Sequence, residues 1–181
     1  MILQAWDGQF VTLGGATGDQ LLAMAASRPE AVHWTLLDAF DPPTNRDTPR
    51  DAAPSSVGSA STLFGSLGRV VHFGDGLALR ADPTGQVAGV DLHDSKQRGA
   101  LRASVPWVRS WERFVLEPPP AQLREPQERN EHSQALRAGR PFALMATNGR
   151  YVSCDLSSDH GLCASATHIQ EWELFRVYPP A

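Results

Sequence analysis

Short apolar runs separated by polar turns make up most of the chain, and their pattern predicts strands. Runs of about four to seven residues rich in Val, Leu, Phe, Tyr and Trp, interrupted by Gly, Asp and Ser, are typical of β-strands and not of helices. The last segment shows this best, reading PFALMAT, a turn NG, RYVSCDL, a turn SSDH, GLCASAT and EWELFRV. It predicts four short strands, and three such segments predict about twelve strands in all.

The same order of motifs occurs in two earlier segments. The first reads AWDGQFVTLGG, LLAMAAS and VHWTLLDAF, and the second reads LRADPTGQVAGVDL, GALRASV and SWERFVLE. An Asn-Gly or Asp-Gly pair between apolar runs predicts a hairpin with a type I′ turn, whose two central residues both need a positive φ. The sequence therefore predicts a threefold internal repeat of four-stranded units. The turns in question are Asp7-Gly8, Thr84-Gly85 and Asn148-Gly149.

Large aromatic residues late in each repeat are the expected centre of the core. Trp34, Trp111 and Trp172 follow their turn glycines at nearly equal spacings. Because a buried aromatic side chain contributes about 150–250 Å² of area, we expect these rings to be core and not ligand platforms. A second set, at the start of the second run of each repeat, is expected to be structural too: Phe10, Val87 and Tyr151.

The motifs that close the second and third repeats resemble those of fascin and fascin-like β-trefoils. Trp111-Glu112-Arg113-Phe114 and Trp172-Glu173-Leu174-Phe175 follow runs that contain LRAS and LCASA, whereas Trp34-Thr35-Leu36-Leu37 lacks the Glu and the Phe. The resemblance implies an all-β, pseudo-threefold fold with six strands in a short barrel and six in a hairpin cap. Actin bundling is not carried over, because cross-linking requires several linked sites and a single trefoil offers at most one unit.

Two polar stretches divide the repeats, and we interpret them as insertions in one β-trefoil domain that spans residues 1–181. The first is rich in Pro, Ser, Asp and Gly, and the second opens with consecutive prolines, as surface connections often do. The expected division is repeat one at about 1–40, an insertion at 41–68, repeat two at about 69–117, an insertion at 118–139 and repeat three at about 140–178.

Composition excludes some classes of partner. A formal net charge of −4 leaves no basic surplus to neutralise phosphates, so nucleic acid and anionic membranes are not expected partners. Apolar runs such as Phe142–Ala146 are far shorter than the roughly 18 to 20 residues that cross a bilayer. Residues 1–10 lack the basic and apolar regions of a secretory signal, and nothing indicates a compartment or an oligomeric state.

The chemistry-bearing residues do not form a recognised catalytic or metal motif. The six histidines have no H-x-H, H-x-x-x-H or H-E-x-x-H spacing, and the chain has neither G-x-S-x-G nor G-x-x-x-x-G-K. We therefore expect no enzyme activity, no cofactor and no metal. Cys154 and Cys163 cannot supply a four-thiolate metal site. They are interpreted as two small buried or half-buried residues, with a cross-strand disulfide as the alternative.

Five residues are the candidate ligand contacts. Asp91 and Asp155 each open a polar turn that also carries a histidine, His93 or His160, and a carboxylate can accept two hydrogen bonds from vicinal sugar hydroxyls. The alternative is that each aspartate only caps a solvated turn. Trp107 follows Pro106 between two strands, where it could stack on a pyranose ring or anchor the loop.

Two functions remain open on these grounds. The first is a non-catalytic module that binds carbohydrate or a glycoconjugate, and the second is a protein-interaction or structural scaffold; an enzyme with an unrecognised site is the residual alternative. Gly14-Gly15 in repeat one occupies the place of Asp91-Leu92 in repeat two. Because glycine offers no side-chain acceptor, we expect ligand binding near Asp91, His93, Asp155 and His160, with repeat one weak or silent.

Overall fold

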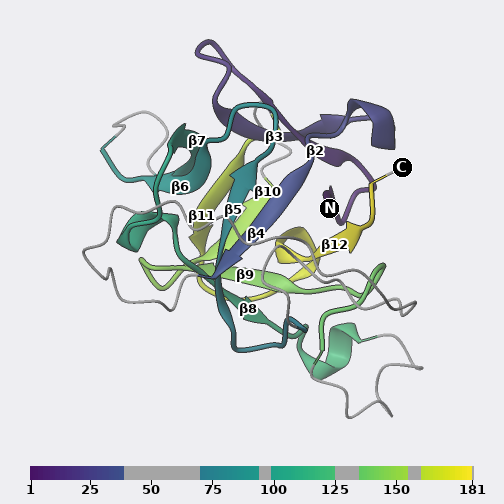
Figure 1. Cartoon of the computed structure of the whole chain (residues 1–181). Helices are drawn as coiled ribbons and strands as arrows, with labels where there is room; N and C mark the ends of the chain where they lie inside the picture. Colours follow the sequence, from purple (N-terminus) through teal and green to yellow (C-terminus); the bar gives the residue numbers. More distant parts are fainter. Residues whose placement is uncertain (39–69, 94–98, 125–134, 155–159, 181) are drawn as a thin grey trace.

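In its described residues, the computed structural model is an all-β protein with twelve strands in one sheet (Figure 1). The structure describes residues 1–38, 70–93, 99–124, 135–154 and 160–180. Helical structure in these ranges is confined to three-residue 3₁₀ turns. The expected insertion at 41–68, residues 125–134 of the expected insertion at 118–139, and Asp155 lie outside the described residues.

Each of the three segments contributes four strands. The first contains β1 (Ile2–Ala5), β2 (Phe10–Gly14), β3 (Gln20–Ala25), the 3₁₀ turn η1 (Arg28–Glu30) and β4 (Trp34–Asp38). The second contains β5 (Gly76–Ala81), β6 (Val87–Asp91), β7 (Ala100–Val105), η2 (Ser110–Glu112) and β8 (Phe114–Glu117), and the turn η3 (Ala121–Leu123) follows it. The third contains β9 (Ala143–Ala146), β10 (Tyr151–Cys154), β11 (Leu162–Ala166), η5 (Glu171–Glu173) and β12 (Phe175–Tyr178).

The hairpin turns follow the predicted positions but not the predicted type. In the third segment Gly149 has φ +72°, whereas among the described residues other than glycine only His160 has a positive φ. Asn148 therefore does not adopt the conformation that a type I′ turn requires. The Ala146 amide donates to Arg150 O and the Gly149 amide to Ala146 O, which gives a three-residue loop closed by glycine. The prediction of a type I′ turn was wrong because the loop is one residue longer than that turn allows.

First and fourth strands pair in a closed circuit. β1 pairs with β12, β4 with β5, β5 with β8, and β8 with β9, all antiparallel. A bridge between Phe142 and Phe175 joins β9 to β12. The circuit closes where the Met1 α-amino group donates to Trp34 O at 2.8 Å and the Trp34 amide donates to Met1 O at 2.7 Å. Burial lowers the pKa of this amino group, and the Asp82 carboxylate partly opposes the shift.

Second and third strands form three hairpins, β2–β3, β6–β7 and β10–β11, that meet in pairs. Three hydrogen bonds of 2.8 Å connect them in a cycle: Ala103 N donates to Asp19 O, Ala164 N to Gly99 O, and Ala23 N to His160 O. Each bond runs from the third strand of one segment to the turn before the third strand of another. The connectivity therefore repeats three times around the molecule.

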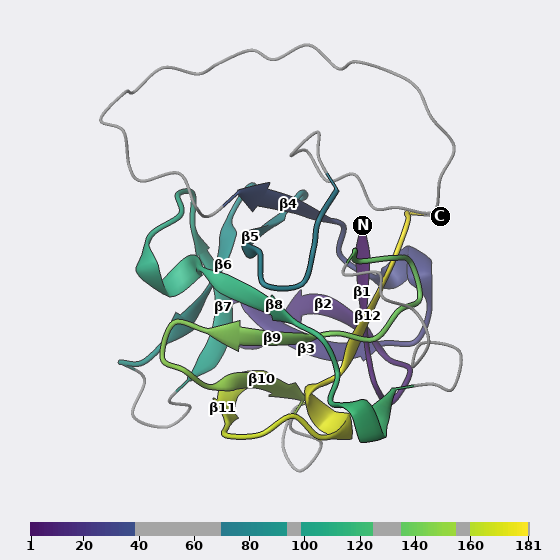
Figure 2. The same cartoon turned by 90° about the horizontal axis from the view of Figure 1, so that it is seen from below.

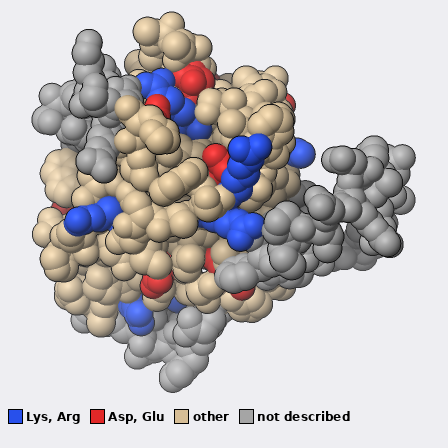
Figure 3. Space-filling view, turned by 90° about the vertical axis from the view of Figure 1, so that its left-hand side faces the viewer, with Lys and Arg blue, Asp and Glu red and all other residues tan. Residues whose placement is uncertain are grey.

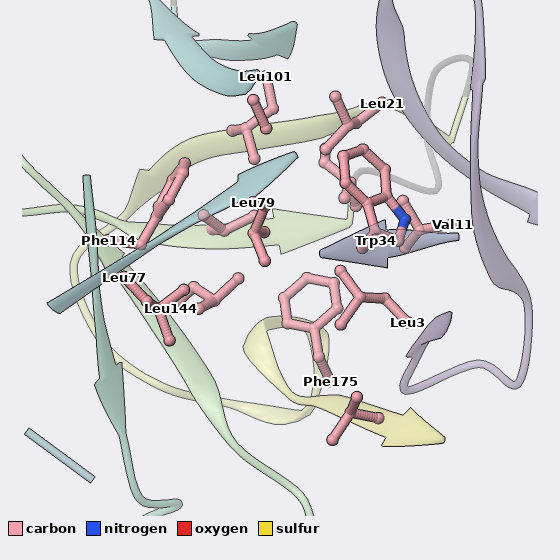
Figure 4. Packing of buried hydrophobic residues seen from close by; sticks show 14 of the residues in the cluster. Leu3, Val11, Leu21, Trp34, Leu77, Leu79, Leu101, Phe114, Leu144 and Phe175 are labelled. Carbon is pink, nitrogen blue, oxygen red and sulfur yellow. The ribbon is translucent and has the colours of Figure 1, made fainter. Parts of the chain in front are cut away.

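The aromatic residue that begins each fourth strand is buried in the hydrophobic core. Trp34, Phe114 and Phe175 are each 1% exposed, and Figure 4 shows their rings around Leu79. Trp111 and Trp172, which were expected in the core, are 42% and 39% exposed. That prediction was wrong for Trp111 and Trp172, which belong to the 3₁₀ turns before β8 and β12. Trp34, in contrast, is itself the first residue of its fourth strand, β4.

The glutamate of each Trp-Glu pair is buried and holds its 3₁₀ turn. Glu112 Oε2 accepts from the Arg109 amide, and Glu173 Oε2 accepts from the Gln170 amide, each at 2.8 Å. The two residues are 8% and 5% exposed. Since each carboxylate satisfies an amide at the start of its turn, the motif has a structural role.

The two cysteines lie on one hairpin and are not joined by a disulfide. Cys154 is opposite Leu162, and Cys163 is opposite Ser153. Because side chains alternate along a strand and directly opposite residues share a face, the two sulfurs point to opposite faces of the hairpin. The alternative of a cross-strand disulfide is therefore wrong.

Candidate functional site

Asp91, predicted as a ligand contact, is engaged in structural interactions at the end of β6. Its Oδ1 accepts from the His93 amide at 2.9 Å, which caps the turn as the alternative interpretation expected. Its Oδ2 lies 3.3 Å from Arg102 Nε. Arg102 also contacts Asp19 Oδ1 at 3.1 Å, so the ion pairs connect β7 to the turn before β3.

The other predicted residues lie on separate elements. The His93 and His160 side chains are exposed, the former after β6 and the latter before β11, and Asp155 lies outside the described residues. His160 has φ +54°, and its carbonyl accepts the Ala23 amide of the interhairpin cycle. Within the described residues, no group of three His, Cys, Asp or Glu side chains could hold a metal ion.

Trp107, the fifth predicted residue, lies on the connection between β7 and η2. It is 50% exposed. A half-exposed ring fits both interpretations, stacking on a sugar ring and partial burial as a loop anchor. The guanidinium carbon of Arg109 lies 5.0 Å from its ring centroid.

A pair of half-exposed tryptophans that the sequence did not predict lies at the junction of the first and third segments. Trp6 and Trp172 are 40% and 39% exposed, and their ring centroids are 5.0 Å apart at an interplanar angle of 77°. Trp6 begins the loop between β1 and β2, and Trp172 is in the middle of η5. The two indoles meet edge to face and form an aromatic corner on the surface.

Strand pairing brings this pair together. Ala5 of β1 is opposite Phe175 of β12, so the residue after Ala5 lies beside the turn before Phe175. At the equivalent loop position the second segment has Asp82 and the third has Thr147, each directly after the alanine that closes the loop. Both side chains hydrogen-bond to the neighbouring segment.

The polar loop residues show what Trp6 replaces. Asp82 Oδ1 accepts from Thr35 Oγ1 at 2.5 Å, and Thr147 Oγ1 donates to the carbonyls of Ser110 and Arg113. The first junction thus has an aromatic contact where the other two have hydrogen bonds. A sequence signal existed, because only the first of the three hairpin loops contains a large aromatic residue.

A pocket of about 280 Å³ opens beside Trp172, between η3 and η5. Figure 2 shows these two turns side by side, η3 in green and η5 in yellow. We call this surface the seam pocket; Trp6 is not among its lining residues but contacts one of them, Trp172. Its lining residues are Gln122, Leu123, Ile169, Gln170, Glu171 and Trp172.

The seam pocket is rigid on one side and polar at its rim. The bond from the Gln170 amide to buried Glu173 fixes the turn that carries Trp172. Gln122 and Glu171 are exposed, and within the described residues their side chains have no hydrogen-bond partner. The pocket therefore combines an aromatic surface with an amide and a carboxylate that are available to a ligand.

Charged side chains on the face that Figure 3 shows do not form a patch of a single sign. Figure 3 shows Lys and Arg side chains scattered among Asp, Glu and a larger number of uncharged residues. Among the described helices, none is long and apolar enough to span a membrane.

Comparisons with known proteins identify a fold but no family. No family model matches the sequence, and no curated protein matches it. The SDF2-like protein from Arabidopsis thaliana has a similar structure, with a TM-score of 0.58 and 11% identity over 99% of this chain and 93% of that chain. A Caenorhabditis elegans protein of unknown function has a TM-score of 0.56 and 12% identity over the same shares, 99% and 93%. Identities this low indicate a shared fold alone.

Proposed function

We propose that the chain is a β-trefoil module that binds carbohydrate non-catalytically at the seam pocket. The trefoil assignment is supported by the closed circuit of six first and fourth strands and by the cycle of three hairpins. A barrel closed in this way leaves few free strand edges. The fascin-like assignment is supported by the shared Trp-Glu motif, whose glutamates both cap a turn.

The observation that carries the function is the Trp6–Trp172 corner. Exposing two indoles to water is unfavourable, and their contact leaves each about two-fifths exposed. A pyranose ring presents C–H groups on one face and hydroxyls around its edge. One indole face can therefore pack against the sugar while the second indole borders it, and a shallow aromatic site of this kind suits a saccharide.

Polar groups beside the corner match the hydroxyls of such a ligand. The Gln122 amide can donate and accept, and the Glu171 carboxylate can accept two hydrogen bonds from vicinal hydroxyls. Both residues line the pocket that Trp172 also lines. The site thus resembles the general pattern of an apolar surface with a few convergent polar groups.

Isothermal titration calorimetry with neutral mono- and disaccharides tests this proposal. We expect binding that Trp172→Ala and Trp6→Ala each abolish. Trp111→Ala is the matched control, because Trp111 is the equivalent residue of η2, is 42% exposed and has no ring partner among the described residues. Absence of binding at millimolar sugar, or an equal loss in Trp111→Ala, would contradict the proposal.

A protein-interaction module is the second candidate, and the same exposed rings favour it. Tryptophan is enriched at the centres of protein interfaces. Under this alternative, Trp6→Ala would weaken self-association or partner binding and sugars would not compete. Light scattering across a concentration series separates the two, because a carbohydrate module is expected to show no Trp6-dependent dimer.

A further inference from the structure

The connection between β7 and η2 exposes a second aromatic surface that the seam pocket does not include. Trp107 is 50% exposed. Arg109 follows it two positions later in the chain, with its guanidinium carbon 5.0 Å from the centroid of the Trp107 ring. We propose that Trp107 and Arg109 form a second site, which binds an acidic saccharide through its carboxylate. This inference rests on the proposed function, because it assumes that the module binds sugars.

The Arg109 guanidinium lies over the Trp107 ring, where a carboxylate can reach it. A guanidinium that lies over an indole keeps its N–H groups directed outward in its own plane, where they match the two oxygens of a carboxylate. Within the described residues, Arg109 has no ion pair and no side-chain hydrogen bond. The aromatic ring restricts the long side chain, so less conformational entropy is lost when the anion binds.

The backbone that carries this second site is held by the buried side chain of Glu112. The Arg109 amide donates to Glu112 Oε2 at 2.8 Å, and Glu112 is 8% exposed. Glu112 lies close to Gly89 of β6, where a Cβ atom would be 2.8 Å from Glu112 Oε1. A glycine at that point allows the carboxylate to approach the strand. The loop is therefore held against the sheet and not left to adapt.

Comparison with the seam pocket gives the charge preference. Counted back from the fourth strand, Arg109 is equivalent to Gln170 and Ser110 to Glu171. The seam pocket therefore carries a carboxylate where the second site carries a hydroxyl, and an amide where the second site carries a guanidinium. An anionic sugar meets repulsion at the first and a charged donor at the second. The seam pocket, with Glu171, and the second site, with Arg109, thus occupy equivalent positions in two repeats but carry side chains of opposite charge.

A matched pair of ligands tests this inference by NMR. Methyl β-D-glucopyranoside and methyl β-D-glucuronide differ only in the group at C6, which is an alcohol in one and a carboxylate in the other. We expect the glucuronide to shift the indole N–H signal of Trp107, assigned with Trp107→Phe, while the neutral glucoside leaves it unchanged. Raising the salt concentration weakens the glucuronide effect.

Substitutions of arginine identify the donor. Arg109→Gln is expected to weaken glucuronide binding by about 10-fold or more, because a charged hydrogen bond is lost. Arg109→Lys restores only part of the affinity, since an ammonium keeps the charge but not the planar fork. Arg150→Gln is the control, because Arg150 is exposed on the β9–β10 loop and lacks a ring partner within the described residues. Unchanged signal dispersion shows that each variant is folded.

The outcomes separate this inference from the proposed function. A neutral sugar that shifts Trp172, with no response of Trp107 to the glucuronide, overturns the second site and leaves the function intact. Equal shifts of Trp107 with both ligands, or an equal loss in Arg150→Gln, also overturn the role of Arg109. Absence of any response to either ligand overturns both proposals.

Discussion

Truncating two aromatic residues three positions apart should have very different effects on stability. Phe175 is 1% exposed and packs against Phe142, with ring centroids 6.3 Å apart. Phe175→Ala removes a fully buried ring from the centre of the core and leaves a cavity, so we expect a loss of about 3–5 kcal/mol in the free energy of unfolding. Trp172 is 39% exposed and its main partner, Trp6, is 40% exposed. Water can fill the space that Trp172→Ala vacates.

The smaller loss for Trp172→Ala comprises the aromatic contact and a part of the buried area, about 1–2 kcal/mol in all. For a domain of this size each kcal/mol lowers Tm by about 2–4 °C, so Phe175→Ala should lower it by at least about 6 °C. Urea unfolding followed by circular dichroism gives both free energies, provided that the m-values stay equal. If Trp172→Ala costs as much as Phe175→Ala, the fourth-strand aromatics are not the core and the repeat has been aligned wrongly.

Three further substitutions test local features. Gly99→Ala should cost about 1–3 kcal/mol by chemical denaturation and more than Gly149→Ala, because both have positive φ but only Gly99 has a carbonyl oxygen 3.1 Å from the new Cβ; equal costs would refute the close contact. Glu173→Ala should cost about 1.5–3 kcal/mol through loss of a charged hydrogen bond, as measured by thermal melting, and a neutral result would show that the turn does not need it. Arg102→Gln should cost about 1 kcal/mol or less and the cost should shrink in high salt, since its ion pairs are partly exposed; an effect that salt leaves unchanged would point to packing instead.

The strands were predictable because their signal is local. Apolar runs bounded by Gly, Asp and Ser specify a hairpin over a few residues, and the threefold repetition of that signal gave the twelve strands. The core was only half predictable. Nearly equal spacing from the turn glycine suggested that Trp34, Trp111 and Trp172 were equivalent, but the first segment has two more residues between its 3₁₀ turn and its fourth strand. A variable connection of this kind shifts an alignment without changing the pattern of the strands.

The candidate site was not predictable from motifs, because its residues belong to three distant parts of the chain. Trp6 and Trp172 meet only through the pairing of β1 with β12, and Gln122 reaches the pocket through the connection after β8. The polar turn at Asp91 was a local signal and was easy to find. The structure shows its carboxylate bound to Arg102 and to a backbone amide, which local sequence cannot reveal.

A crystal structure of the chain soaked with a neutral disaccharide, in a lattice that leaves the seam pocket open, tests the central claim most directly. We expect a sugar ring packed on the Trp6–Trp172 corner, with hydroxyls directed toward Gln122 or Glu171. A sugar bound instead beside Asp91 and His93, with the corner empty, would contradict the account.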